Sequence, residues 1–186
     1  MVNIGRRIVV YGSTGSGKTT VAARIARCLG VPHIELDAIH WLPGWVEKPL
    51  DEFRAELLAL LDSHADGWVC DGNYSEVRDI VLPRADTVVW LRLPLWVIFW
   101  RLLKRTVSRA WNRESLWGTN YESWRLTFFS RDSLLLYALT AGRHAGDKAI
   151  RIHRAIPDGT TLYGLRSSGE VRAFLASLMR EEEPGD

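Results

Sequence analysis

Residues 12–19 read Gly-Ser-Thr-Gly-Ser-Gly-Lys-Thr, and this stretch decides how the rest of the chain is interpreted. It fits the pattern G-x-x-x-x-G-K-[ST] without a mismatch. The apolar residues 7–11 precede it, and residues 19–29 follow it with apolar side chains at helical spacing. A glycine-rich turn from a buried strand into a helix presents backbone N–H groups and a helix N-terminus, which together bind phosphate. The stretch therefore predicts a nucleotide-binding P-loop.

The chemistry of this loop predicts ATP and Mg²⁺ as its ligands. Lys18 is expected to reach the β- and γ-phosphates, where it serves catalysis, and the Thr19 hydroxyl is expected to bind Mg²⁺. The residues predicted to hold the nucleotide at the loop are Gly12, Ser13, Thr14, Gly15, Ser16, Gly17, Lys18, Thr19 and Thr20.

The remaining sequence alternates apolar segments with amphipathic ones. Further strands are predicted at 33–36, 67–70, 87–91 and 160–163, and helices at 50–64, 75–82, 94–110, 132–141 and 168–179. Residues 38–49 are predicted to form a loop. This alternation favours a three-layer α/β fold, a P-loop NTPase with a five-stranded parallel sheet. We expect one P-loop kinase-like domain over 1–180, a helical or irregular lid insertion at about 108–150, and a disordered tail at 181–186.

Two carboxylates follow predicted strands at the end of the sheet where ligands bind in open α/β folds. Asp71 is the predicted second Mg²⁺ anchor, although it would also suit a cap on the turn that follows. Asp37 is the predicted base for the acceptor hydroxyl, and the alternative is the N-cap of a short helix. His40, Trp41 and Trp45 are candidate walls of an acceptor pocket, the alternative being loop residues packed on the core.

A basic segment follows the fourth predicted strand. Residues 92–131 hold eight basic and two acidic side chains. Arg101, Arg105, Arg109 and Arg113 recur every four residues without an interleaved acid, which favours a polyanion as their partner over a solvated helix face. We expect Arg105, Arg109 and Arg113 to act on the γ-phosphate when the lid closes.

Composition excludes several classes of protein. The chain has 186 residues, of which 47% are hydrophobic and 25% charged, as in ordinary globular proteins. Its longest apolar runs are six residues, whereas a membrane helix needs about 20. The N-terminal segment lacks the apolar stretch of a signal peptide, so a cytoplasmic location is expected. Cys28 and Cys70 are expected to be buried thiols.

These motifs resemble those of the small P-loop kinases known as DNA topology modulation proteins, within the adenylate-kinase-like group. The resemblance is carried by the P-loop, residues 37–41 and 43–45, Asp71-Gly-Asn-Tyr74, the stretch from Ala85-Asp-Thr87 to Leu93-Pro94, and Leu165-Arg-Ser167. It covers residues 7–110 well and 160–178 moderately. It implies the strand order 2-3-1-4-5.

The same resemblance suggests roles for two arginines: Arg101 against adenine and Arg105 at phosphate. We assign Arg166 to the nucleotide as well. The sequence departs from the group at Asn73-Tyr74-Ser75, where the arginine that binds a nucleoside monophosphate is missing, which argues against AMP as the acceptor. Arg78 is the candidate replacement.

The predicted function is ATP- and Mg²⁺-dependent phosphoryl transfer to a small-molecule or nucleotide acceptor. The acceptor is expected to contact Asp37, His40, Trp41, Asn73, Tyr74 and Arg78. One alternative is a nucleic-acid-associated P-loop NTPase, because arginine and tryptophan interleave in the basic segment. Another is a nucleotide-binding regulatory module with negligible turnover. We expect a monomer or homodimer with no membrane partner.

Overall fold

The computed structural model describes residues 3–112, 115–116, 120–121 and 155–180, with side chains over 3–104 and 155–179. Its centre is a five-stranded sheet whose neighbouring strands are all parallel. The strands lie in the order β2 (His33–Glu35), β5 (Trp68–Asp71), β1 (Arg7–Gly12), β6 (Thr87–Leu91) and β9 (Thr161–Leu165). Numbered along the chain, this is the expected order 2-3-1-4-5.

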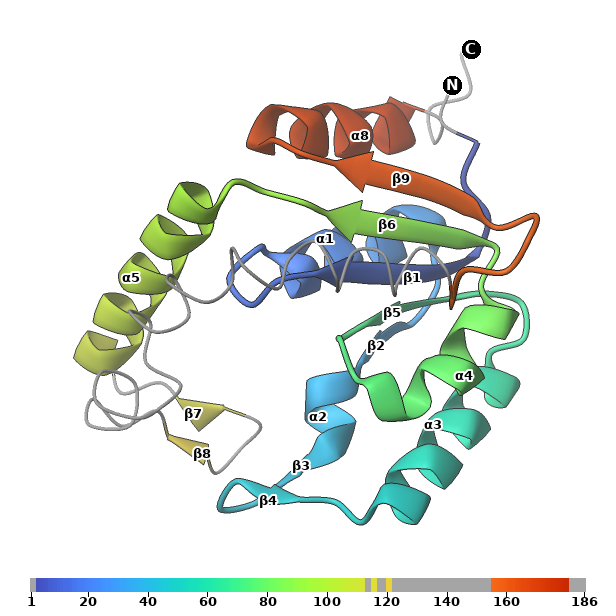
Figure 1. The fold of residues 1–186 in the computed structure, drawn as a ribbon, viewed down its shortest axis with the longest axis horizontal. Coiled ribbons are helices and arrows are strands. Elements are labelled where there is room, and N and C mark those ends of the chain that lie inside the picture. Colours follow the sequence, from blue (N-terminus) through green and yellow to red (C-terminus); the bar gives the residue numbers. More distant parts are fainter. Residues whose placement is uncertain (1–2, 113–114, 117–119, 122–154, 181–186) are drawn as a thin grey trace.

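Helices cover both faces of the sheet, so the predicted three-layer fold is confirmed (Figure 1). Because side chains alternate along a strand, Ile8 and Val10 of β1 face one layer while Val9 and Tyr11 face the other. The first layer holds α1 (Lys18–Leu29) and α8 (Ser168–Arg180). The second holds α3 (Leu50–Ser63) and α4 (Arg78–Val81), the latter flanked by single turns at Ser75–Val77 and Leu82–Arg84.

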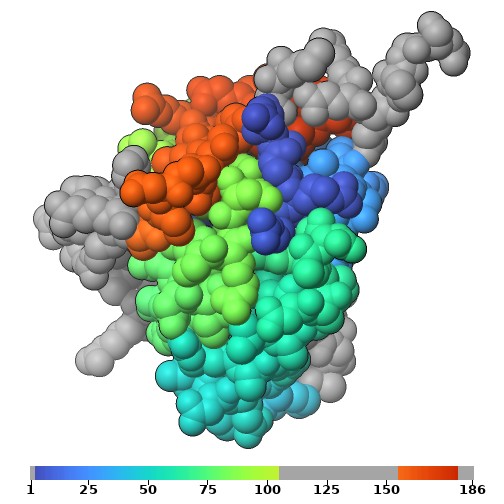
Figure 2. Space-filling model, turned by 90° about the vertical axis from the view of Figure 1, so that its right-hand side faces the viewer, coloured from blue at the N-terminus to red at the C-terminus, as the bar shows by residue number. Residues whose placement is uncertain are grey.

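The strands run toward the side of the molecule where α5 (Leu95–Asn112) lies (Figure 1). Ile98 and Leu102 on the first half of this helix pack with Leu93 in a small separate cluster. The opposite side, which holds the amino ends of the strands, is shown in Figure 2. Ligand-binding residues are therefore expected on the α5 side, at the carboxyl ends of the strands.

The prediction of a loop at 38–49 is wrong. The chain instead forms α2 (Leu36–His40) and a hairpin of β3 (Trp41–Leu42) and β4 (Val46–Glu47). Burial of Leu36 and Ile39 on one side of α2 stabilises its short helical turn. A three-residue turn then closes the hairpin, with Gly44 at φ 78° and Trp45 at φ 61°. This helix and hairpin contain too few residues to show a periodic pattern in the sequence, so packing rather than a sequence pattern defines them.

The insertion is described only in part. Helix α5 extends to Asn112, beyond the expected start of the insertion near 108, and β7 (Ser115–Leu116) pairs antiparallel with β8 (Asn120–Tyr121). The helix predicted at 132–141 and the tail at 181–186 lie outside the described residues. Within the described ranges, every helix is too short or too polar to cross a membrane.

Candidate active site

The backbone conformation of the glycine-rich loop depends on one turn hydrogen bond and on two glycines. The Ser16 N–H donates to the Ser13 carbonyl at 3.0 Å, which closes the turn before α1. Gly17 is the residue that precedes α1, and its φ of 90° lies in the left-handed region that favours glycine. Gly15 also has a positive φ, 79°, and a Cβ there would lie 2.5 Å from Leu102 Cγ. These two constraints explain why the loop needs glycine at both positions.

A chain of hydrogen bonds joins the loop to the neighbouring strands. The Thr19 hydroxyl donates to Asp71 Oδ2 at 2.7 Å, and His33 Nε2 lies 3.0 Å from Asp71 Oδ1. Asp71 itself is 2% exposed at the end of β5. Asp71 therefore contacts the residue predicted to bind Mg²⁺ and is held from a second direction by His33.

This pair offers the oxygen donors that Mg²⁺ prefers. The hydroxyl of Thr19 and the carboxylate of Asp71 come from different elements yet lie within hydrogen-bond distance. Among the described residues, no group of three or more His, Cys, Asp or Glu side chains could enclose a metal by itself. Mg²⁺ usually keeps several waters and takes further ligands from bound phosphates. The donor set thus fits a magnesium ion that arrives with a nucleotide.

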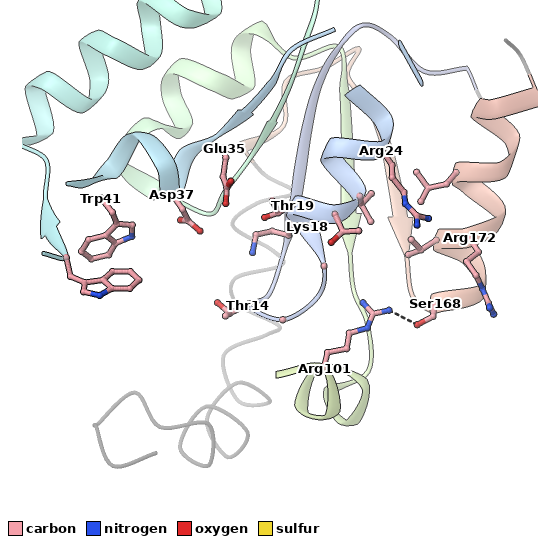
Figure 3. Close-up of a pocket in the computed structure, with 17 residues that line it drawn as sticks. Thr14, Lys18, Thr19, Arg24, Glu35, Asp37, Trp41, Arg101, Ser168 and Arg172 are labelled. Atoms are coloured by element: carbon pink, nitrogen blue, oxygen red, sulfur yellow. Dashed lines mark hydrogen bonds between the residues drawn. The ribbon is translucent and has the colours of Figure 1, made fainter. Parts of the chain in front are cut away.

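One cavity of about 910 Å³ runs along the loop and has two chemically different sides (Figure 3). Arg101, Arg24 and Arg172 lie on one side, together with Ser168 at the start of α8. Glu35 and Asp37 lie on the other, and the Lys18 amino group points toward that side in Figure 3. The remaining lining residues include Thr14, Gly15, Gly17, Thr19, Thr20, Trp41 and Trp45.

Asp37 is held by Tyr74 from the loop after β5. The Tyr74 hydroxyl donates to Asp37 Oδ1 at 2.7 Å. Burial raises the pKa of Tyr74 well above its usual value, and its hydrogen bond to the Asp37 carboxylate raises it further. Tyr74 therefore stays protonated and keeps donating, which fixes the orientation of Asp37. Asp37 is the second residue of α2 rather than its N-cap, which is Glu35.

A second cavity, of about 520 Å³, lies beneath the β3–β4 hairpin. Tyr74 and Trp41 line it, and Trp41 lines the first cavity as well. The His40 ring contacts Trp41, Phe53 and Tyr74, with ring centroids 4.9, 5.1 and 4.6 Å away. The structure thus brings His40, Trp41 and Tyr74 together beside Asp37, as a site of mostly aromatic character.

Two other predicted acceptor residues have different surroundings. The Asn73 amide group donates to the Gly12 carbonyl at 2.6 Å and accepts from the Gly12 N–H at 3.5 Å, so it clamps the start of the P-loop. Arg78 lies close to Tyr11: burial raises the pKa of Tyr11 to about 12, and the positive charge of Arg78 lowers it in part. Neither contact is to the acceptor side of the large cavity, so their assignment as acceptor ligands stays a prediction.

The predicted arginines are only partly within the described side chains. Arg101 donates to the Ser16 carbonyl at 2.7 Å and to the Ser168 hydroxyl at 3.1 Å, so it lies against the P-loop. Arg166 follows β9, where its backbone N–H donates to Glu170, and it is not among the residues that line the large cavity. The side chains of Arg105 and Arg109 on α5, and all of Arg113, lie outside the described residues. The lid role of these three stays a prediction.

Sequence reasoning missed several lining or supporting residues, among them His33, Glu35, Arg24 and Arg172. His33 begins β2 and pairs in register with Val69, two residues before Asp71. The signal available in the sequence was the position of His33 and Glu35 on a strand that the resemblance placed beside β5. For Arg24 and Arg172, helical position alone could not indicate that α1 and α8 face the same cavity.

The comparisons with known proteins agree on the fold. A sugar kinase from a Janibacter species superposes with a TM-score of 0.51 and 21% identity, over 96% of this chain and 92% of that one. A shikimate kinase from Acinetobacter baumannii, solved with shikimate, has a TM-score of 0.50 and 18% identity, over 96% and 93% of the two chains. A shikimate kinase from Bacteroides thetaiotaomicron gives 0.50 and 18%, over 95% and 98%. The chain therefore has the fold of P-loop kinases.

At the level of sequence the likeness is shorter. The ATP-dependent protease ATPase subunit HslU of Borreliella burgdorferi is 30% identical over 82 residues, which are 44% of this chain. This chain spans only 17% of the length of that relative. No protein-family model matches the chain. Membership in the DNA topology modulation family therefore stays a prediction.

Proposed function

We propose that the protein transfers the γ-phosphoryl group of ATP, with Mg²⁺, to a hydroxyl group of a small molecule. The observation that carries this proposal is the large cavity, which is lined by Lys18 and Thr19 of the phosphate loop and also by Asp37. A nucleotide-binding protein that performs no transfer has no need of a carboxylate and aromatic rings facing the same cavity as the P-loop. The geometry therefore supports two substrates bound side by side.

In this proposal each residue has a physical task. The loop N–H groups and Lys18 would hold the β- and γ-phosphates, and Thr19 with Asp71 would hold Mg²⁺, which neutralises phosphate charge. Arg101, hydrogen-bonded to the loop at Ser16, would add positive charge near the nucleotide. Catalysis of phosphoryl transfer depends mainly on such positioning and charge neutralisation.

Asp37 would orient the acceptor and take its proton. The acceptor oxygen bonds to the γ-phosphorus, the bond from that phosphorus to the bridging oxygen breaks, and ADP leaves. The hydroxyl proton passes to Asp37. Because Tyr74 donates to Oδ1 of Asp37, it acts as a positioning residue that aims the carboxylate.

The names of the similar proteins are consistent with this class of reaction. Two of the structures are kinases of small molecules, a sugar and shikimate, and the relative in sequence is an ATPase subunit. An adenylate-kinase-like acceptor, which would receive the phosphoryl group on a phosphate oxygen rather than on a hydroxyl, is the alternative to this proposal. The nucleic-acid alternative depends on residues 101–131, most of whose side chains lie outside the described residues.

The test is ADP release from ATP and Mg²⁺ in the presence of a library of hydroxyl compounds, with phosphorylated product detected by mass spectrometry. We expect at least one compound to raise ADP release well above the rate with ATP alone and to gain a phosphoryl group. The Lys18→Ala variant is the control for a contaminating kinase. ATP turnover that no compound changes, with no phosphorylated product, would rule out the proposed function.

A further inference from the structure

The acceptor side of the site is acidic, and the arginines of the large cavity lie on the nucleotide side, while the Lys18 amino group points toward the acidic side (Figure 3). Glu35 and Asp37 line the large cavity beside Trp41, and Glu47 and Glu76 line the cavity beneath the hairpin. A ligand that spans both cavities would meet four carboxylates, of which Glu47 and Glu76 are exposed and Glu35 and Asp37 partly buried. An anionic group on such a ligand would be repelled by the nearest of them, since like charges repel.

Lys48 and Arg54, both near this region, are paired with acids. Lys48, which lines the second cavity, forms an ion pair with Glu56. Arg54 donates to both carboxylate oxygens of Asp79, at 2.9 and 2.6 Å. Arg78 lies near Tyr11 and lines neither cavity, although its buried Nε has no hydrogen-bond partner. Among the described side chains, Lys48 and Arg54 are thus paired with acids, and no arginine lines the cavity beneath the hairpin.

The second cavity also contains an unmet hydrogen-bonding group. His40 Nδ1 is buried and has no hydrogen-bond partner, although the His40 ring lines the cavity. Buried polar atoms in native proteins nearly always have a partner, so one without any points to a missing ligand or water. An imidazole nitrogen donates or accepts according to its tautomer, so a ligand hydroxyl or amine would supply the partner once a small movement of the ring exposes Nδ1, which has almost no accessible surface.

The aromatic walls suit a ligand with alternating apolar and polar surface. Trp41 and Trp45 meet edge to face, with ring centroids 5.7 Å apart, and Phe53 lies 5.4 Å from Tyr74 in the same manner. Aromatic faces pack against the C–H surface of a sugar ring or against a base, and carboxylates accept hydrogen bonds from its hydroxyl groups. Trp41 lines both cavities and Tyr74 touches Asp37, so the second cavity adjoins the reacting end.

We propose that the phosphoryl acceptor is a hydroxyl compound without phosphate or carboxylate groups, of the size of a sugar, amino sugar or nucleoside, and that its far end occupies the cavity beneath the β3–β4 hairpin. This inference rests on the proposed function. It excludes nucleoside monophosphates and sugar acids as preferred acceptors.

The test uses acceptors matched in shape and different in charge. ADP release is measured with glucose, glucosamine, gluconate and glucose 6-phosphate, with adenosine and AMP, and with a wider library built in the same neutral, cationic and anionic sets. We expect kcat/KM at least tenfold higher for neutral or cationic members than for their anionic partners. A preferred anionic acceptor would overturn the inference and leave the proposed function standing. Turnover of no compound in any charge class would overturn the proposed function and the inference together.

Variants then test the location with the best acceptor found. The double variant Glu47→Gln/Glu76→Gln and the single variant His40→Phe should each raise the acceptor KM about tenfold, the loss expected for a hydrogen bond to a buried or charged group. The KM for ATP should stay within about twofold, because ATP binds at the P-loop side. Glu52→Gln, an exposed acid on α3 that lines neither cavity, is the matched control. Thermal unfolding confirms that each variant is folded, and an unchanged acceptor KM in both test variants would overturn the assignment of the cavity.

Discussion

Asp71→Asn is the substitution that separates the metal site from the acceptor site. The carboxylate is 2% exposed, lies 2.7 Å from the Thr19 hydroxyl oxygen and 3.0 Å from His33 Nε2. Asparagine keeps the shape of the side chain and one acceptor oxygen but removes the negative charge. The change therefore weakens the attraction for Mg²⁺ while leaving the packing at the end of β5 in place.

The size of the effect follows from these contacts. Removing a partner that supports a metal ligand typically lowers metal affinity about 10–100-fold. We therefore expect the Mg²⁺ concentration at half-maximal rate to rise by a factor of about 10–100, and the rate at high Mg²⁺ to recover most of its loss. One neutral hydrogen bond replaces a charge-assisted one, so stability should fall by about 1 kcal/mol. For a chain of this size that lowers Tm by about 2–4 °C.

The assay is the initial rate of ADP formation against free Mg²⁺, with Asp37→Asn as the companion variant. Asp37 lines the acceptor side and is held by Tyr74, so its loss should reduce kcat by about 10²–10⁴ at every Mg²⁺ concentration. If added Mg²⁺ restores Asp37→Asn and not Asp71→Asn, the two roles are reversed. If the Mg²⁺ dependence of Asp71→Asn matches that of the original protein, the metal role of Asp71 is refuted.

Three further predictions test the loop and the core. Lys18→Ala should lower the transfer rate by more than tenfold, a loss above about 1.4 kcal/mol, with Tm unchanged, and retention of over a tenth of the rate would contradict its role. Gly15→Ala should lower Tm and weaken binding of a fluorescent ATP analogue, because the new Cβ would lie 2.5 Å from Leu102 Cγ and the residue has a φ of 79°. Adding Leu102→Ala to this variant should restore part of the binding, and no recovery would count against the packing argument. Cys70 is buried as expected, whereas Cys28 is only partly buried, contrary to the expectation. Burial raises the pKa of the Cys70 thiol, so in native protein iodoacetamide should modify Cys28 first, as peptide mass spectrometry would show, and faster labelling of Cys70 would contradict its burial.

Local sequence patterns were sufficient for the P-loop and for the three-layer fold. The glycine spacing at 12–17, the apolar strand before it and the helical period after it act over a few residues, so they can be interpreted without the rest of the chain. The strand order came from the resemblance and was confirmed by the sheet. The hairpin at Trp41–Glu47 was missed because two-residue strands are too short for a period of two to be visible.

The arrangement of the site depended on tertiary structure. His33 lies within hydrogen-bond distance of Asp71, 38 residues away in the sequence, and Asn73 donates a hydrogen bond to Gly12, 61 residues away. Such contacts depend on which strands are neighbours and which way each side chain points, and neither property is encoded within a short window. The same holds for Arg78, which sequence reasoning assigned to an acceptor and which the structure places against Tyr11. Residue types at strand ends thus indicated phosphate chemistry, while packing between distant segments decided which of them share a cavity and which support the loop from behind.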